Sequence, residues 1–80
     1  MPSDEAIAAA LMDLAVRRGT GASFCPSEVA RALASDWRPL MPEVRRVAAA
    51  LADQGRLTAT QRGMAVSLTT ARGPVRLRLP

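Results

Sequence analysis

The segment from Pro42 to Gly63 constrains the fold most, because a helical pattern there changes directly into the pattern of a strand. Proline suits the first turn of a helix, since its fixed φ is already helical and its missing N–H would lack a partner there. Apolar residues then recur at spacings of three and four, which predicts a helix from about 42 to 54 with one buried stripe. The stripe consists of Val44, Val47, Ala48 and Leu51.

Gly55 marks the end of this helix, because glycine readily adopts the left-handed conformation that follows a helix C-terminus. The residues after it alternate between two faces, and this period of two predicts a strand over residues 57–62. A similar alternation predicts a second strand over residues 75–79, joined to the first by a connection from Gly63 to Gly73. One face of the first strand holds Leu57, Ala59 and Gln61, and one face of the second holds Val75, Leu77 and Leu79.

Two more helices are expected before this unit. Ser3 can cap the first, and Asp4 and Glu5 lie in its first turn, where the helix dipole favours acidic residues. Gly19 ends that helix, and Pro26 begins the second. Residues 23–25 are too short for an independent element but suit a short strand that pairs with the later hairpin. The expected core consists of Ile7, Leu11, Leu14, Phe24, Val29, Leu33, Val44, Val47, Leu51, Leu57, Val75, Leu77 and Leu79.

Three helices followed by a C-terminal β-hairpin, with a short strand between the first two helices, form the architecture of winged helix-turn-helix proteins. We therefore predict an α+β winged-helix fold in a single domain over residues 1–80. Eighty residues approach the lower limit for a core without disulfides or a metal. Much of the apolar composition is alanine, which buries little area, so a modest stability is expected.

The net charge of +4 is concentrated in the second half of the chain. Residues 1–42 carry four arginines against five acidic residues, and residues 43–80 carry seven arginines against two, which leaves +5 there. This asymmetry favours a polyanionic partner. The alternative explanation is a compositional bias, because all eleven basic residues are arginine.

Side chains that commonly carry catalysis are scarce in this chain. It has no His and no Tyr, so its single cysteine, Cys25, lacks a histidine that could activate it. Potential metal ligands are not clustered, and no Gly-rich phosphate loop is present. We therefore expect no enzymatic activity, no cofactor, no metal and no small-molecule ligand. The acidic N-terminus, the short apolar run at 7–16 and the lone cysteine predict a cytoplasmic protein without a membrane partner.

Four arginines are the best candidates for contact with a nucleic acid. Arg45 and Arg46 lie on the face of the third helix away from the apolar stripe, and arginine can donate forked hydrogen bonds to guanine or phosphate. Arg62 and Arg72 flank the tip of the predicted hairpin, where a wing would touch the DNA backbone or minor groove. We expect the basic C-terminal half to form one continuous surface. The alternative for the helical pair is ordinary surface pairing, for example of Arg46 with Glu43.

Three further residues permit either a structural or a binding role. Arg76 and Arg78 share one strand face, which can equally be a solvated face that discourages edge pairing. Trp37 lies in the loop before the third helix, where it could stack on a base. A tryptophan in such a loop more often fixes the loop against the core.

Four segments of the chain resemble a family of short, uncharacterised bacterial proteins, a domain of unknown function. They span residues 24–33, 37–45, 55–63 and 71–77, and include Cys-Pro-Ser-Glu-Val-Ala at 25–30 and Ala-Arg-Gly-Pro at 71–74. The resemblance covers the chain from about residue 5 to residue 79 and implies a stand-alone winged-helix domain. It brings no catalytic or binding residues, because the function of that family is unassigned.

The functional hypothesis is a DNA-binding winged-helix protein, a small transcriptional or accessory factor whose partner is double-stranded DNA. The third helix and the wing would make the contacts. One alternative is a protein-interaction module without nucleic-acid binding, which would use the alanine-rich helix faces and Trp37. Another is an RNA-binding adaptor. The sequence shows no clear interface, and it leaves a homodimer and a protein partner open.

Overall fold

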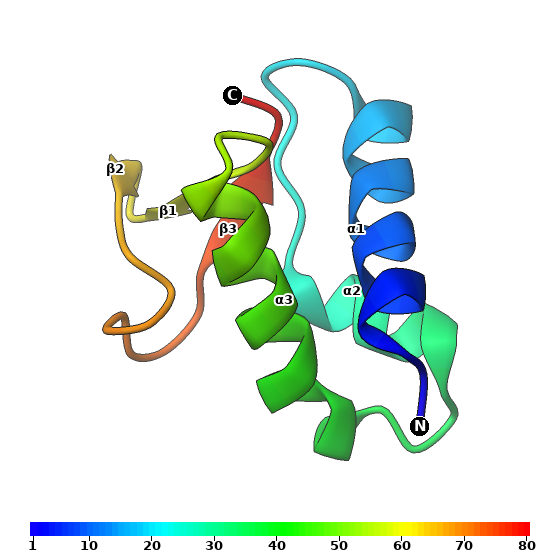
Figure 1. The fold of residues 1–80 in the computed structure, drawn as a ribbon. Helices are drawn as coiled ribbons and strands as arrows, with labels where there is room; N and C mark the ends of the chain where they lie inside the picture. Colours follow the sequence, from blue (N-terminus) through cyan, green and yellow to red (C-terminus); the bar gives the residue numbers. More distant parts are fainter.

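The computed structural model describes all residues from Met1 to Pro80, and it confirms the α+β winged-helix prediction. Three helices precede a three-stranded antiparallel sheet, and α3 lies between α1 and the sheet (Figure 1). None of the helices combines the length and the apolar character that crossing a bilayer requires. The elements are α1 (Asp4–Arg18), α2 (Pro26–Leu33), the 3₁₀ turn η1 (Arg38–Leu40), α3 (Met41–Asp53), β1 (Thr58–Gln61), β2 (Met64–Ala65) and β3 (Arg76–Arg78).

The helix boundaries follow the local signals of the sequence. At the start of α1, the Ser3 hydroxyl accepts a hydrogen bond from the Ala6 N–H at 3.1 Å, as its capping role predicts. Pro26 is the first residue of α2. The third helix begins at Met41, one residue before the predicted start, because η1 runs into it without a break. After it, Gly55 has φ of 74°, the left-handed conformation expected there.

The core forms where the apolar stripe of α3 meets α1, α2 and the sheet. All four residues of the predicted α3 stripe are buried. Two buried leucines were not predicted: Leu40 lies in η1 and Leu68 in the loop after β2, and neither segment has a periodic pattern to indicate burial. Three predicted core residues are only half-buried, because they lie at the edges of their elements rather than at the centre; these are Leu14, Leu33 and Leu79.

The sheet has β1 at its centre, with β2 on one edge and β3 on the other. The predicted pairing of the two C-terminal strands is confirmed, with Ala59 opposite Leu77. Phe24 forms a bridge to Leu77 through two backbone hydrogen bonds of 2.8 Å, which is the short strand expected between the first two helices. The segment from Thr58 to Arg78 is called the wing below.

The predicted connection after β1 contains one more strand, which the sequence analysis did not identify. Gln61 pairs with Met64, so only Arg62 and Gly63 form the turn between β1 and β2. Both have positive φ, 55° and 81°, as the tightest hairpin turns require. Asn-Gly is the usual sequence for such a turn, and Arg-Gly is a weak signal because arginine seldom adopts positive φ.

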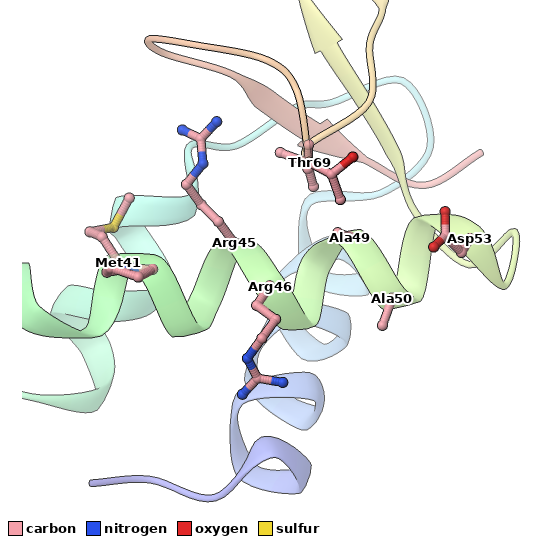
Figure 2. Close-up of a pocket in the computed structure, with 9 residues that line it drawn as sticks. Met41, Arg45, Arg46, Ala49, Ala50, Asp53 and Thr69 are labelled. Carbon is pink, nitrogen blue, oxygen red and sulfur yellow. The ribbon is translucent and has the colours of Figure 1, made fainter.

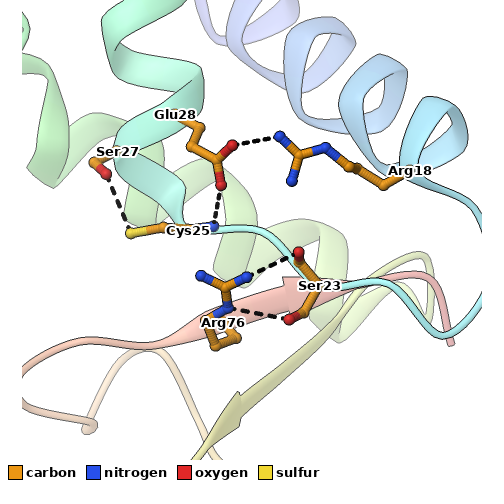
Figure 3. Close-up of polar contacts among 6 residues, drawn as sticks. All are labelled: Arg18, Ser23, Cys25, Ser27, Glu28 and Arg76. Atoms are coloured by element: carbon orange, nitrogen blue, oxygen red, sulfur yellow. Dashed lines mark hydrogen bonds and ion pairs between the residues drawn. The ribbon is translucent and has the colours of Figure 1, made fainter.

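The N-terminal end of α2 links the helices to the wing (Figure 3). Glu28 accepts a hydrogen bond from the Cys25 backbone N–H at 2.9 Å and another from the Arg18 guanidinium at 2.5 Å. Below it, Arg76 of β3 donates to the hydroxyl and the carbonyl of Ser23 at 3.0 and 2.9 Å. The first turn of α2 is therefore joined to α1 by the ion pair of Glu28 with Arg18. The segment before α2 is joined to β3 by side-chain bonds of Arg76 and by the backbone bonds between Phe24 and Leu77.

The Glu28 carboxyl makes the free energy of unfolding depend on pH in the acidic range. The Cys25 N–H, followed by the Arg18 guanidinium, holds the pKa of the Glu28 carboxyl below its usual value of about 4.3. A carboxyl with a lowered pKa in the folded protein stabilises it above that usual value, and the contribution is lost as pH falls through the lowered pKa. We expect Glu28→Gln to reduce the free energy of unfolding at pH 7 by about 1 kcal/mol.

Urea denaturation of both proteins from pH 7 to pH 3 measures this effect. The difference between wild type and Glu28→Gln should shrink below about pH 4.3, because the wild-type carboxyl is then increasingly protonated. Glu5→Gln is the matched control, since Glu5 forms no ion pair. A difference that stays constant down to pH 3 would contradict a role for the Glu28 charge.

Leu68 is the apolar anchor of the loop between β2 and β3, with 8% of its surface exposed. Removing a buried leucine side chain loses its transfer free energy and leaves a cavity. We expect Leu68→Ala to lower the free energy of unfolding by about 2 kcal/mol. Met64→Ala, at a side chain that is 73% exposed, should change it by less than about 0.5 kcal/mol. Equal effects of the two substitutions in urea denaturation would show that the loop does not dock as described.

Candidate nucleic-acid interface

A groove of about 710 Å³ follows the exposed face of α3 and is bounded on one side by the loop that carries Leu68 and Thr69 (Figure 2). The middle of its helical wall is formed by Ala49 and Ala50, which project only methyl groups. Asp53 closes the groove at the C-terminal end of the helix. This is the helix face that the sequence analysis assigned to DNA contact, and its centre carries no hydrogen-bonding side chain.

Arg45 and Arg46 point to opposite sides of α3, although the sequence analysis placed them on one cationic surface (Figure 2). Arg45 extends toward the wing, whereas Arg46 extends toward α1. Neighbouring residues of an α-helix are separated by about 100° around its axis, so two long side chains diverge. The expected continuous basic surface is therefore divided along the helix.

Arg46 is held by two carboxylates. It donates to both oxygens of Asp4, at 2.6 and 3.0 Å, and to Glu43 at 2.6 Å. The hydrogen bond from Arg46 lowers the pKa of the Asp4 carboxyl, and the two carboxylates raise the pKa of Arg46 in return. The positive charge on this side of α3 is thus compensated within the protein, by the pairing with Glu43 that was the structural alternative and by a second pair with α1.

Arg45 is bound to the backbone of the wing. Its two terminal nitrogens donate to the carbonyls of Ala71 and Gly73, each at 3.1 Å. From the other side, the Gln61 amide donates to the carbonyls of Arg72 and Pro74, at 2.5 and 3.1 Å. Four successive carbonyls, which have no strand partner, therefore receive hydrogen bonds alternately from α3 and from β1. We call this arrangement of residues 71–74 between Arg45 and Gln61 the carbonyl clamp.

Beside the carbonyl clamp lies a hollow of about 520 Å³ lined by three arginines and no acidic residue. Arg62 comes from the turn after β1, Arg72 from the clamped segment and Arg76 from β3. The side chains of Arg62 and Arg72 form no hydrogen bond or ion pair with the protein, and Arg76 donates only to Ser23. We call this the basic hollow; its lining consists of Gln61, Arg62, Arg72, Gly73, Pro74 and Arg76.

The structure thus brings together two of the four predicted site residues, Arg62 and Arg72, and adds Arg76 to them. Guanidinium groups without internal partners suit a phosphate, because each can donate a forked pair of hydrogen bonds to it. Whether Arg45 and Arg46 contact a nucleic acid stays a prediction. Each already donates hydrogen bonds inside the protein.

Trp37 is flanked by two arginines that the sequence analysis did not select. The guanidinium carbons of Arg31 and Arg38 lie 4.5 and 4.7 Å from the centre of its ring. Trp37 is half-buried and packs against the core, which agrees with the structural interpretation of this residue. Arg38 follows Trp37 directly in the sequence, but the approach of Arg31 depends on how the chain turns after α2.

The helices and the wing define a winged-helix domain, and three of its arginines line the basic hollow on the wing. Residues 4–80 match the family described as "Protein of unknown function (DUF3253)". The chain belongs to this family, in agreement with the resemblance found in its sequence. None of the curated proteins compared with the chain matches it.

The carbonyl clamp predicts that Arg45 controls the mobility of the wing. Arg45→Met keeps most of the side-chain length but removes two hydrogen bonds, each contributing about 1 kcal/mol. We expect amide hydrogen exchange in residues 67–74 to become about tenfold faster or more. Arg46→Met should leave the exchange rates of residues 67–74 unchanged and accelerate exchange at the start of α1, where Asp4 loses its partner. Unchanged exchange of residues 67–74 in Arg45→Met would contradict the clamp.

Proposed function

We propose that this domain binds double-stranded DNA as a small transcriptional or accessory factor, with the basic hollow as its main phosphate contact. The observation that carries the proposal is the gathering of Arg62, Arg72 and Arg76 around one hollow without a carboxylate. Uncompensated positive charge on a surface favours a polyanion, and phosphate contacts supply most of the affinity in DNA binding. We propose a binding role rather than catalysis, because no group suited to acid–base chemistry lines the hollow.

The groove along α3 supports a duplex as the form of nucleic acid. Ala49 and Ala50 allow the helix to approach a surface closely, and the major groove of B-DNA admits an α-helix. The deep, narrow major groove of an RNA duplex does not admit side chains in this way. In the proposed arrangement α3 enters the major groove while the wing contacts the adjacent backbone.

This arrangement favours weak sequence preference. Arg46 is engaged by two carboxylates, Arg45 by two carbonyls, and the alanines can contact only a thymine methyl group. The longest dimension of the domain is 30 Å, which is less than one turn of B-DNA, so one copy contacts few phosphates. The proposed binding is therefore dominated by the DNA backbone and strongly dependent on salt.

A protein-interaction module is the second candidate, and one observation favours it. The groove beside α3 is partly apolar, with Met41, Ala49, Ala50 and Leu68 in its walls. A protein bound in this groove would still co-purify with the domain after nuclease treatment of a native lysate, whereas proteins associated only through DNA would be released. Binding to purified duplex DNA with no protein present discriminates between the two functions.

Two substitutions in the basic hollow test the DNA-binding proposal. Arg62→Asn removes a charge but keeps a residue that tolerates the positive φ of the turn, so we expect its stability to be equal to or above that of wild type. Arg72→Gln removes the second charge from an exposed side chain. In fluorescence anisotropy with a mixed-sequence duplex, each should weaken binding and reduce the slope of log affinity against log salt by about 0.9.

Arg17→Gln is the control for net charge, because Arg17 lies on α1 and is paired with Asp13. It should leave the affinity and the salt slope close to those of wild type. Absence of binding by the wild-type protein at low salt would refute the proposal, as would equal losses in Arg17→Gln and the two wing variants.

A further inference from the structure

We infer that the turn between α2 and α3 carries a second phosphate contact, formed by Arg31 and Arg38 on the ring of Trp37. This inference rests on the proposed binding of duplex DNA and adds a site on a different part of the fold. We call the three residues the turn stack. Neither arginine belongs to the basic hollow or to the groove along α3.

Trp37 holds both arginines in place. Arg31 lies in the last turn of α2, and Arg38 is the first residue of η1. Their guanidinium carbons lie 4.5 and 4.7 Å from the ring centre, within the range of a cation–π interaction. Because the ring itself packs against the core, the two charged groups rest on a fixed surface. Binding a ligand would then immobilise less side-chain freedom than it would with unsupported arginines.

The hydrogen-bonding edges of both guanidinium groups have no protein partner. Neither the Arg31 nor the Arg38 side chain forms an ion pair or a hydrogen bond with the protein, and Asp36, the neighbour of Trp37, pairs with neither of them. An indole ring attracts a cation but offers no strong acceptor in its plane. The N–H donors of the turn stack therefore remain available for a ligand, and an oxyanion is the ligand that such donors bind.

Five other arginines have partners within the protein, whereas four have none for their side chains: Arg56, Arg62, Arg72 and Arg78. Arg17, Arg18 and Arg46 are paired with carboxylates. Arg45 and Arg76 donate to backbone carbonyls. In the turn stack, two like charges instead share one ring with no counter-ion. Their mutual repulsion opposes folding, and a bound phosphate would relieve it.

The turn stack is well placed for the proposed complex. Because η1 runs directly into α3, Arg38 lies only three residues before Met41, the first residue of the helix. The connection from α2 meets α3 at the end away from the strands of the wing (Figure 1). In helix-turn-helix complexes the helix before the recognition helix crosses the DNA backbone. Arg31 and Arg38 would thus contact phosphates near the N-terminal end of α3, while the basic hollow contacts other phosphates at the wing.

Intrinsic fluorescence gives a direct test, because Trp37 is the only tryptophan and the chain has no tyrosine. Addition of a mixed-sequence duplex to the wild-type protein should change the Trp37 emission along the same titration curve as the anisotropy. Arg31→Gln and Arg38→Gln should each weaken binding and reduce the salt slope by about 0.9. Arg38→Lys, which keeps the charge, should retain the wild-type slope, and Arg17→Gln is again the control. The melting temperature of each variant establishes that it is folded at the temperature of the binding measurement.

The outcomes separate this inference from the proposed function. If the wild-type protein does not bind the duplex, the DNA-binding proposal fails and the inference fails with it. If Arg62→Asn weakens binding while Arg31→Gln and Arg38→Gln retain the wild-type salt slope, the proposed function stands and the turn stack is not a phosphate contact. An unchanged Trp37 emission at saturating duplex would also overturn the inference.

Discussion

The carbonyl clamp is the interaction on which the position of the wing relative to α3 depends. The segment from Ala71 to Pro74 has no strand beside it, and its carbonyls accept hydrogen bonds from side chains instead. Arg45 and Gln61 donate these bonds from α3 and β1. This places Arg72 at the basic hollow and brings the chain back in register for β3. The same contact makes the loop a wall of the groove along α3, so one arginine shapes both surfaces.

The distribution of charge follows from which arginines have internal partners. On the side of α3 toward α1, Arg46 is neutralised by Asp4 and Glu43. On the side toward the wing, no carboxylate forms an ion pair with Arg62, Arg72 or Arg76. The excess charge of the C-terminal half is therefore displayed mainly by the wing. For this reason the proposed DNA complex depends more on contacts between the wing and the phosphate backbone than on base recognition by α3.

The fold was largely predictable because its signals are local. The stripe of α3, the proline and glycine boundaries and the alternation in β1 and β3 each specify an element within a few residues. The strand β2 was missed because Arg62 occupies a positive-φ position that sequence statistics assign to other residues. Leu68 was missed because burial in an irregular loop depends on what the loop docks against, and no periodicity records that.

The sequence by itself determined the order of the elements, the winged-helix class and the excess of positive charge in the second half. These properties depend on spacing along the chain, which periodicity and composition report directly. Only the tertiary structure decided which group each arginine side chain contacts. Arg45 donates to carbonyls 26 and 28 residues away, and Arg46 pairs with Asp4, 42 residues away. Arg31 and Arg38 both lie against the ring of Trp37. The physical reason is that an arginine side chain is long and can reach partners on any neighbouring element. Its partner is therefore fixed by the packing of helices and wing, not by its position in the sequence.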